Sequence, residues 1–137
     1  MEIKKGTTLY FAEADYKHLQ IIKEVEGLED ATLVRCQQSA EKYAKHLLKE
    51  HSGEINTTHN IPVIINQLIP TYPELKSYMS IARFLKDCYY DRNYETDSYL
   101  ELDEEDYREY LDKSINFIEF LRGLCLTELG KNSPTLF

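Results

Sequence analysis

The 137-residue sequence has few glycines, prolines and cysteines, and it has no long apolar stretch. Five glycines and four prolines are too few for an all-β chain, which needs many tight turns. No apolar run approaches the roughly 20 residues of a membrane-spanning helix. The first residues also lack the apolar segment of a secretory signal. We therefore expect one cytoplasmic domain that does not contact a membrane.

The three cysteines, Cys36, Cys88 and Cys125, are odd in number and far apart. A disulfide framework or a structural zinc site needs closely patterned cysteines, so neither is expected. His46 and His51 are five residues apart and do not share a helix face as a zinc-binding pair would. The glycines are isolated, which leaves no phosphate-binding glycine loop. The sequence predicts buried free thiols, no metal site and no cofactor.

Negative charge is concentrated in one segment. The formal net charge is −8, and residues 91–109 alone carry nine acidic and two basic side chains. A strongly acidic surface argues against tight nonspecific binding of nucleic acid, because that attraction depends on lysine and arginine. It does not exclude a small basic pocket. The simplest interpretation of the acidic segment is a solvated loop followed by the first turn of a helix.

Apolar residues recur every three or four positions in five segments, and no segment alternates as a strand would. The sequence predicts helices over residues 8–27, 30–53, 61–69, 73–90 and 103–126. Thr8, Asp30, Asn60 and Asp103 are the expected N-caps, and Gly53 is expected to end the second helix.

Two long helices, a short one and two more indicate an all-α, antiparallel up-and-down bundle. We expect this bundle to occupy residues 1–126 and residues 127–137 to form a loose tail. The apolar stripes continue into apolar flanks on the second, fourth and fifth helices, at Ala44, Leu48, Met79, Tyr90, Phe117, Phe120 and Leu124. Because one four-helix core cannot cover so much apolar surface, the sequence also predicts a homodimer.

Two residues stand out as candidates for a site. His59 directly precedes the short third helix, where its imidazole could hydrogen-bond the loop backbone or contact a ligand. Arg92 follows the fourth helix and is flanked by Asn93 and Tyr94. It could be ion-paired with a neighbouring acid or interact with the helix end. Alternatively, its planar guanidinium could bind a phosphate or a nucleobase.

Four segments together resemble the HEPN family (higher eukaryotes and prokaryotes nucleotide-binding). Residues 35–48, Arg-Cys-Gln-Gln-Ser-Ala-Glu-Lys-Tyr-Ala-Lys-His-Leu-Leu, are similar to the family's central motif. Residues 12–16 resemble its A-x-x-D-L segment, and residues 58–61 resemble its T-H-D/N-L segment. Residues 89–94 are similar to its Y-x-x-x-R-Y-P segment, although Asn93-Tyr94 departs from it. The resemblance covers residues 8–126 and implies an all-α bundle that usually dimerises.

The resemblance also implies several functions. Some HEPN proteins are ribonuclease toxins that use an arginine and a histidine four to six residues after it. Here those positions are Thr96, Asp97 and Ser98, and no histidine follows His59. Their side chains cannot replace an imidazole that titrates near neutrality. The sequence therefore favours a protein that is not an enzyme and has no catalytic residue.

The leading hypothesis is a homodimeric, non-catalytic HEPN module. It would bind a nucleotide or assist a minimal nucleotidyltransferase in a toxin–antitoxin-like system. We expect Arg92 to hold phosphate, Tyr94 or Tyr89 to stack on a base, Asn93 to hydrogen-bond and His59 to support the site. The alternatives are a metal-independent ribonuclease toxin that binds RNA and a dimerising adaptor that binds another protein.

Overall fold

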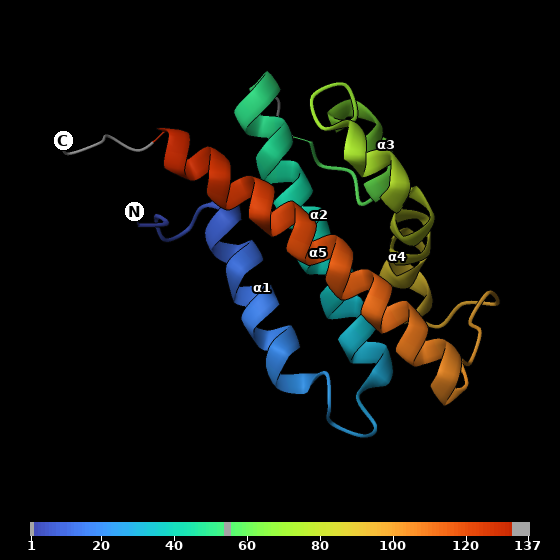
Figure 1. Cartoon of the computed structure of the whole chain (residues 1–137). Coiled ribbons are helices and arrows are strands. Elements are labelled where there is room, and N and C mark those ends of the chain that lie inside the picture. The colour runs from blue at the N-terminus through green and yellow to red at the C-terminus, as the bar shows by residue number, and fades with distance from the viewer. Residues whose placement is uncertain (1, 54–55, 133–137) are drawn as a thin grey trace.

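A computed structural model describes residues 2–53 and 56–132, and within these ranges it contains five α-helices, one 3₁₀ helix and no strand. The elements in chain order are α1 (Thr8–Ile22), α2 (Glu29–Ser52), α3 (Ile61–Leu68), η1 (Pro73–Tyr78), α4 (Met79–Asp91) and α5 (Glu104–Asn132). The helices pack into a bundle (Figure 1). The predicted all-α helical fold is confirmed.

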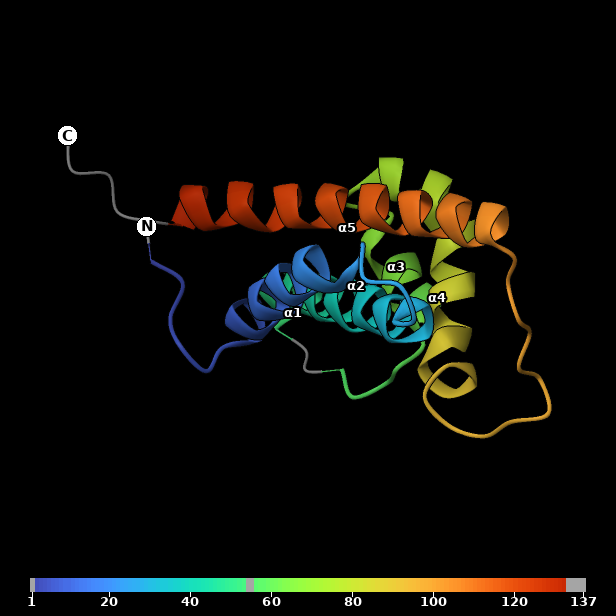
Figure 2. The ribbon, with the colours of Figure 1, turned by 90° about the horizontal axis from the view of Figure 1, so that it is seen from below.

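Helix α2 is the centre of the bundle. It packs against α1, α3, α4 and α5, and Figure 1 shows α1 on one side of it, α3 and α4 on the other and α5 crossing over it. Figure 2 shows α5 as a straight rod that forms a layer over α1 and α2. Leu33, Tyr43 and Leu47 of α2 are fully buried in the core that results. The central motif therefore lies on the most enclosed helix.

Two of the predicted N-caps are confirmed. The Asn60 side chain accepts a hydrogen bond from the Val63 N–H at 3.3 Å, and the Asp103 carboxylate accepts one from the Asp106 N–H at 2.8 Å. Both contacts satisfy a backbone donor that a helix start would leave unpaired. Gly53 ends α2 with a left-handed φ of +72°, a conformation that glycine adopts without steric cost.

The other two predicted caps are wrong. Thr7, one residue before Thr8, caps α1 by accepting from the Tyr10 N–H. Asp30 lies within the first turn of α2, and no side chain caps that helix. The Asp30 carboxylate bonds elsewhere, as described below. For Asp30, contacts with distant residues take the place of the predicted local cap.

Helices four and five differ from their predicted extents. The segment expected as one helix over 73–90 is split into η1 and α4. Helix α5 continues to Asn132, so residues 127–132 are helical although we expected them in the loose tail. Leu129 packs against the core, which accounts for a helix that extends past 126. Residues 133–137, the remainder of that expected tail, lie outside the described residues.

The apolar flanks that suggested a dimer are largely used within one chain. Ala44, Leu48 and Phe117 are buried in the single bundle, Met79, Phe120 and Leu124 are partly buried, and Tyr90 is 57% exposed. The homodimer stays a prediction, and of these flank residues Tyr90 is the one left largely exposed.

All three cysteines are free and buried, as predicted. Burial raises the pKa of the Cys88 thiol to about 12 and raises the pKa values of Cys36 and Cys125 as well. These thiols therefore stay protonated and unreactive near neutral pH. Among the described helices, none has the length and apolar character needed to cross a membrane.

Candidate ligand-binding site

The structure separates the five candidate residues into two groups. His59, Tyr89 and Tyr94 lie in one cluster of rings, whereas Arg92 belongs to a second cluster with Asp30. Asn93 is exposed, and its backbone N–H donates to the Tyr90 carbonyl. Among the contacts of the described residues, no hydrogen bond, ion pair or ring contact joins His59 to Arg92. The five candidate residues therefore do not form one connected cluster among the described contacts.

The first site is an aromatic cluster made by His59, Tyr89, Tyr90 and Tyr94. The His59 ring stacks on Tyr89 with 4.0 Å between centroids and 14° between planes. Tyr90 meets Tyr89 edge-on at 4.7 Å, and the Tyr94 centroid is 6.4 Å from that of Tyr89. Tyr90 and Tyr94 are 57% and 58% exposed. The cluster thus presents two exposed rings beside a fixed pair.

A buried carboxylate holds His59 in place. The His59 Nδ1 atom lies 3.1 and 3.2 Å from the two carboxylate oxygens of Glu41. Because a carboxylate only accepts hydrogen bonds, Nδ1 is the donor, which leaves Nε2 as the acceptor of the neutral ring. The His59 side chain is 42% exposed and that of Glu41 only 5%. The buried Glu41 carboxylate therefore orients the imidazole of His59, which remains accessible to solvent.

Two further side chains of α2 stabilise the buried charge of Glu41. The Gln37 amide donates to one oxygen at 2.7 Å, and the Lys45 ammonium lies 2.9 Å from the other. The Gln38 side-chain amide in turn donates to Oε1 of Gln37 at 2.7 Å. A buried carboxylate requires such partners, because losing its hydration is costly. We did not single out Gln37, Glu41 and Lys45 from the sequence, although their four-residue spacing on a buried helix was a usable signal.

The second site is built around Arg92, at the C-terminal end of α4. Its Nη1 atom donates to Asp30 Oδ1 at 2.7 Å, and its Nη2 atom donates to the Leu100 carbonyl at 2.7 Å. The guanidinium also lies 5.3 Å from the centre of the Tyr99 ring, and the Tyr99 hydroxyl donates to Asp30 Oδ2. Only 6% of the Arg92 side chain is exposed. Of the interpretations that the sequence allowed for Arg92, the structure shows the ion pair.

The pKa of Arg92 reflects two opposing effects. Burial lowers it, but the hydrogen bond and charge of Asp30 more than compensate, so the pKa is raised above its ordinary value. Arg92 is therefore a permanent cation that is held by groups of its own chain. It joins the end of α4 to the start of α2 and to the following loop.

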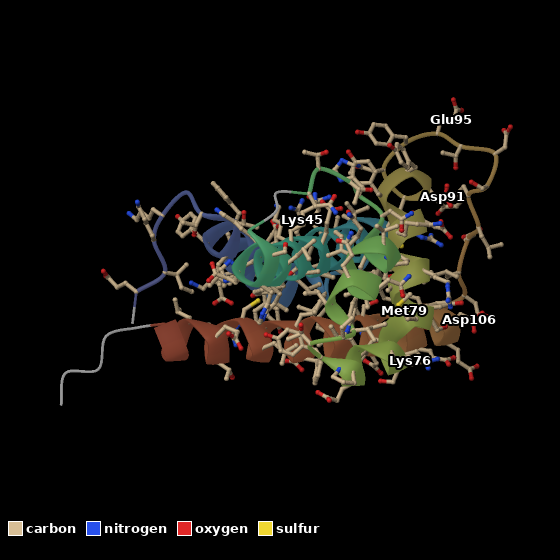
Figure 3. All side chains as sticks on the ribbon, turned by 90° about the horizontal axis from the view of Figure 1, so that it is seen from above. Lys45, Lys76, Met79, Asp91, Glu95 and Asp106 are labelled. Atoms are coloured by element: carbon tan, nitrogen blue, oxygen red, sulfur yellow. The ribbon has the colours of Figure 1, made fainter. Side chains whose placement is uncertain are left out.

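The loop after Arg92 is organised by a second set of contacts. The hydroxyls of Thr96 and Ser98 donate to Asp91 Oδ1 at 3.1 and 2.7 Å. Figure 3 shows Asp91 at the end of α4 and Glu95 on the loop, away from Lys45 on α2. The positions where a ribonuclease of this kind would carry its histidine thus form a polar turn. Among the described residues, no group of three histidine, cysteine or carboxylate side chains could hold a metal ion.

The family model of the HEPN domain matches residues 8–124. This chain belongs to the HEPN family. The match runs from the start of α1 into the last third of α5 and includes both clusters. Neither a curated protein nor a solved structure matches the chain.

The HEPN motif residues have clear physical roles in this chain. The central motif on α2 contains the Gln37–Glu41–Lys45 network. The segment before α3 contains His59, which bonds Glu41. There the Thr58 hydroxyl accepts from the Asn60 N–H at 3.1 Å, and Asn60 caps α3. This tight turn directs His59, between them, toward Glu41.

Proposed function

We propose that this HEPN protein is a non-catalytic module that binds the base of a nucleotide or of single-stranded RNA at the aromatic cluster. The observation that carries the proposal is the fixed His59–Tyr89 stack beside the exposed Tyr90 and Tyr94 rings. Base–aromatic stacking contributes about 1–3 kcal/mol per base and tolerates different bases. A site built in this way suits a mononucleotide or a short single strand.

The polar groups around the rings would orient the base. Because Glu41 occupies Nδ1 of His59, the Nε2 atom is available to hydrogen-bond the ligand. Asn93 is exposed next to Tyr94 and offers both an amide donor and a carbonyl acceptor. Arg92 would act by holding the loop rather than by gripping phosphate, because its guanidinium already bonds Asp30 and Leu100.

The same contacts argue against ribonuclease activity. A catalytic arginine would have to reach the phosphate in the transition state, whereas Arg92 is 6% exposed and ion-paired. We propose instead that the module works with a minimal nucleotidyltransferase, the partner implied by its family resemblance. Co-purification of the two proteins tests that partnership.

Calorimetric titration tests base binding. We expect heat on adding at least one of the four ribonucleoside triphosphates or a short single-stranded RNA. Tyr94→Ala should weaken binding about fivefold to 150-fold, as the loss of one stacking ring implies. Phe11→Ala is the matched control, because Phe11 is an exposed ring on α1, outside the cluster. Absence of heat with every ligand, or equal weakening by Phe11→Ala, would contradict the proposal.

A further inference from the structure

A cavity of about 600 Å³ opens at one end of the bundle and contains none of the aromatic cluster. Its walls are residues 23–27 after α1, the start of α2, Arg92 after α4, three residues of the following loop (Tyr99, Glu101 and Leu102) and the start of α5. Figure 1 shows the turn after α1, the start of α5 and the preceding loop at the same end of the molecule. We call this feature the end cavity.

The end cavity carries an excess of negative charge. Six lining residues are acidic: Glu24, Glu26, Glu29, Asp30, Glu101 and Glu104. Two of these carboxylates are neutralised within the chain, since Asp30 pairs with Arg92 and Glu24 pairs with Arg108. The other four carboxylates have no ion pair among the described residues. Of the three lining cations, Arg92 and Arg108 are ion-paired and Lys23 is not, again among the described residues.

Helix dipoles offset only part of this charge. Glu29 and Glu104 lie in the first turns of α2 and α5, where each helix presents about half a positive charge. Glu26 and Glu101 lie outside any helix and receive no such compensation. The cavity therefore favours a cationic occupant and repels phosphate or nucleic acid.

Exposed apolar side chains surround the same cavity. Val25 and Tyr99 line it and are each 47% exposed. Leu28 and Leu100 are next to lining residues in the chain and are 38% and 68% exposed. Apolar surface rimmed by charge is typical of a protein-binding site. An inorganic cation or a polyamine would leave these side chains uncovered.

The loop that carries Tyr99 and Leu100 is already ordered. Arg92 binds the Leu100 carbonyl, and Tyr99 binds Asp30 of α2. The backbone is held from inside while the Leu100 side chain remains exposed. A partner would therefore bind without the entropic cost of ordering this loop.

We infer that the end cavity is a docking site for an apolar segment of a partner protein that bears lysine or arginine. A second copy of this chain fits poorly, because two copies of the cavity would bring unpaired carboxylates together. The inference does not depend on base binding at the aromatic cluster, which lies outside the cavity.

The test uses fluorescence anisotropy with a labelled short peptide of alternating leucine and lysine. We expect this peptide to bind, and we expect its glutamate-for-lysine and serine-for-leucine counterparts not to bind. The double variant Glu26→Gln with Glu101→Gln should weaken binding about fivefold, and Leu100→Ser about tenfold. Tyr89→Ala should leave peptide binding unchanged, which separates this result from that of the proposed function.

Matched variants distinguish docking from general charge attraction. Glu95→Gln with Asp97→Asn removes the same amount of charge from the loop that carries Glu101, outside the cavity lining, and Val63→Ser removes an exposed apolar side chain from α3. Both should bind the leucine–lysine peptide as the unmodified chain does. Equal weakening by these controls, no binding of the peptide, or binding of single-stranded RNA in the cavity overturns the inference.

Discussion

Arg92 and His59 are both candidates from the sequence, and the structure gives them opposite surroundings. Arg92 directs its terminal nitrogens to Asp30 and the Leu100 carbonyl, so it has little left to offer a ligand. His59 uses one ring nitrogen on Glu41 and stays 42% exposed. For a single residue, the contacts that its side chain makes within the chain determine whether that side chain is available to bind a ligand.

Removing the charge of Asp30 should destabilise the fold. Asp30→Asn keeps the side-chain shape but leaves Arg92, 6% exposed, without its counter-ion. We expect the free energy of unfolding to fall by about 1–3 kcal/mol in urea denaturation. Asp112→Asn, at an exposed position on α5, is the control and should change it by less than about 0.5 kcal/mol. Equal effects of the two variants would show that the Arg92 contact contributes nothing.

The Glu13 carboxylate predicts how stability depends on pH. Burial opposes its ionisation, but the hydrogen bonds from Arg122 and Tyr43 prevail and lower its pKa below the ordinary 4.5. The folded state thus binds fewer protons than the unfolded state. The stabilisation is present above pH 4.5 and is lost as the pH falls through the lowered pKa.

Chemical denaturation between neutral pH and pH 3 checks this dependence. The free energy of unfolding should decline below about pH 4.5, and the decline should be smaller for Glu13→Gln. Glu109→Gln, at an exposed position on α5, serves as the control and should keep the full decline. If Glu13→Gln declines as steeply as the unmodified chain, the Arg122 contact does not set this pKa.

Among the elements, α3 is the one whose existence depends most on its ends. It has only eight residues, and helices of that length are unstable alone in water. Asn60 caps it, Pro62 suits its first turn, and Ile61, Ile64, Ile65 and Leu68 bury its apolar face. Because His59 directly precedes this cap, the start of α3 also fixes the aromatic cluster.

Loss of the α3 cap should affect stability and the site together. Asn60→Ala removes the acceptor of the Val63 N–H and should lower the free energy of unfolding by about 1 kcal/mol. We expect Asn60→Asp to retain most of it. Asn66→Ala, at an exposed position on the same helix, is the control. Thermal unfolding monitored by circular dichroism measures the change, and equal losses at positions 60 and 66 would exclude a capping role.

At the scale of the whole molecule, the central position of α2 organises both sites. Its Asp30 end holds Arg92, and its middle section supplies the Gln37–Glu41–Lys45 network. The acidic segment that forms the loop before α5 and the first turn of α5 contributes Glu101 and Glu104 to the end cavity. Helix α2 thus contributes both to the support of the aromatic cluster and to the wall of the end cavity.

The predicted homodimer concerns the whole molecule, and a measurement of the mass in solution tests it. Sedimentation equilibrium should give a mass of about 32 kDa if two 16.1 kDa chains associate. Most of the apolar flanks that suggested association are covered within one chain, so a dimer would need another face. A single species of 16.1 kDa across the concentration range would contradict the prediction.

The sequence by itself determined the helices and the family. Apolar spacing, the Asn60 and Asp103 side chains and Gly53 act between residues a few positions apart, so their effects can be predicted without knowing the fold. The same holds for the ordered string of the central motif, which the HEPN family model matches. The predictions differed from the structure at the end of α1, which stops at Ile22 rather than residue 27, and at the end of α5, where Leu129 packs against the core.

Only the tertiary structure determined which charged side chains form ion pairs or hydrogen bonds with one another. Arg92 pairs with an aspartate 62 positions away, and His59 with a glutamate 18 positions away. With 16 basic and 24 acidic side chains, the sequence allows many such pairs. The packing of α4 against α2 selects among them, because a buried charge is stable only beside the partner that the fold places there.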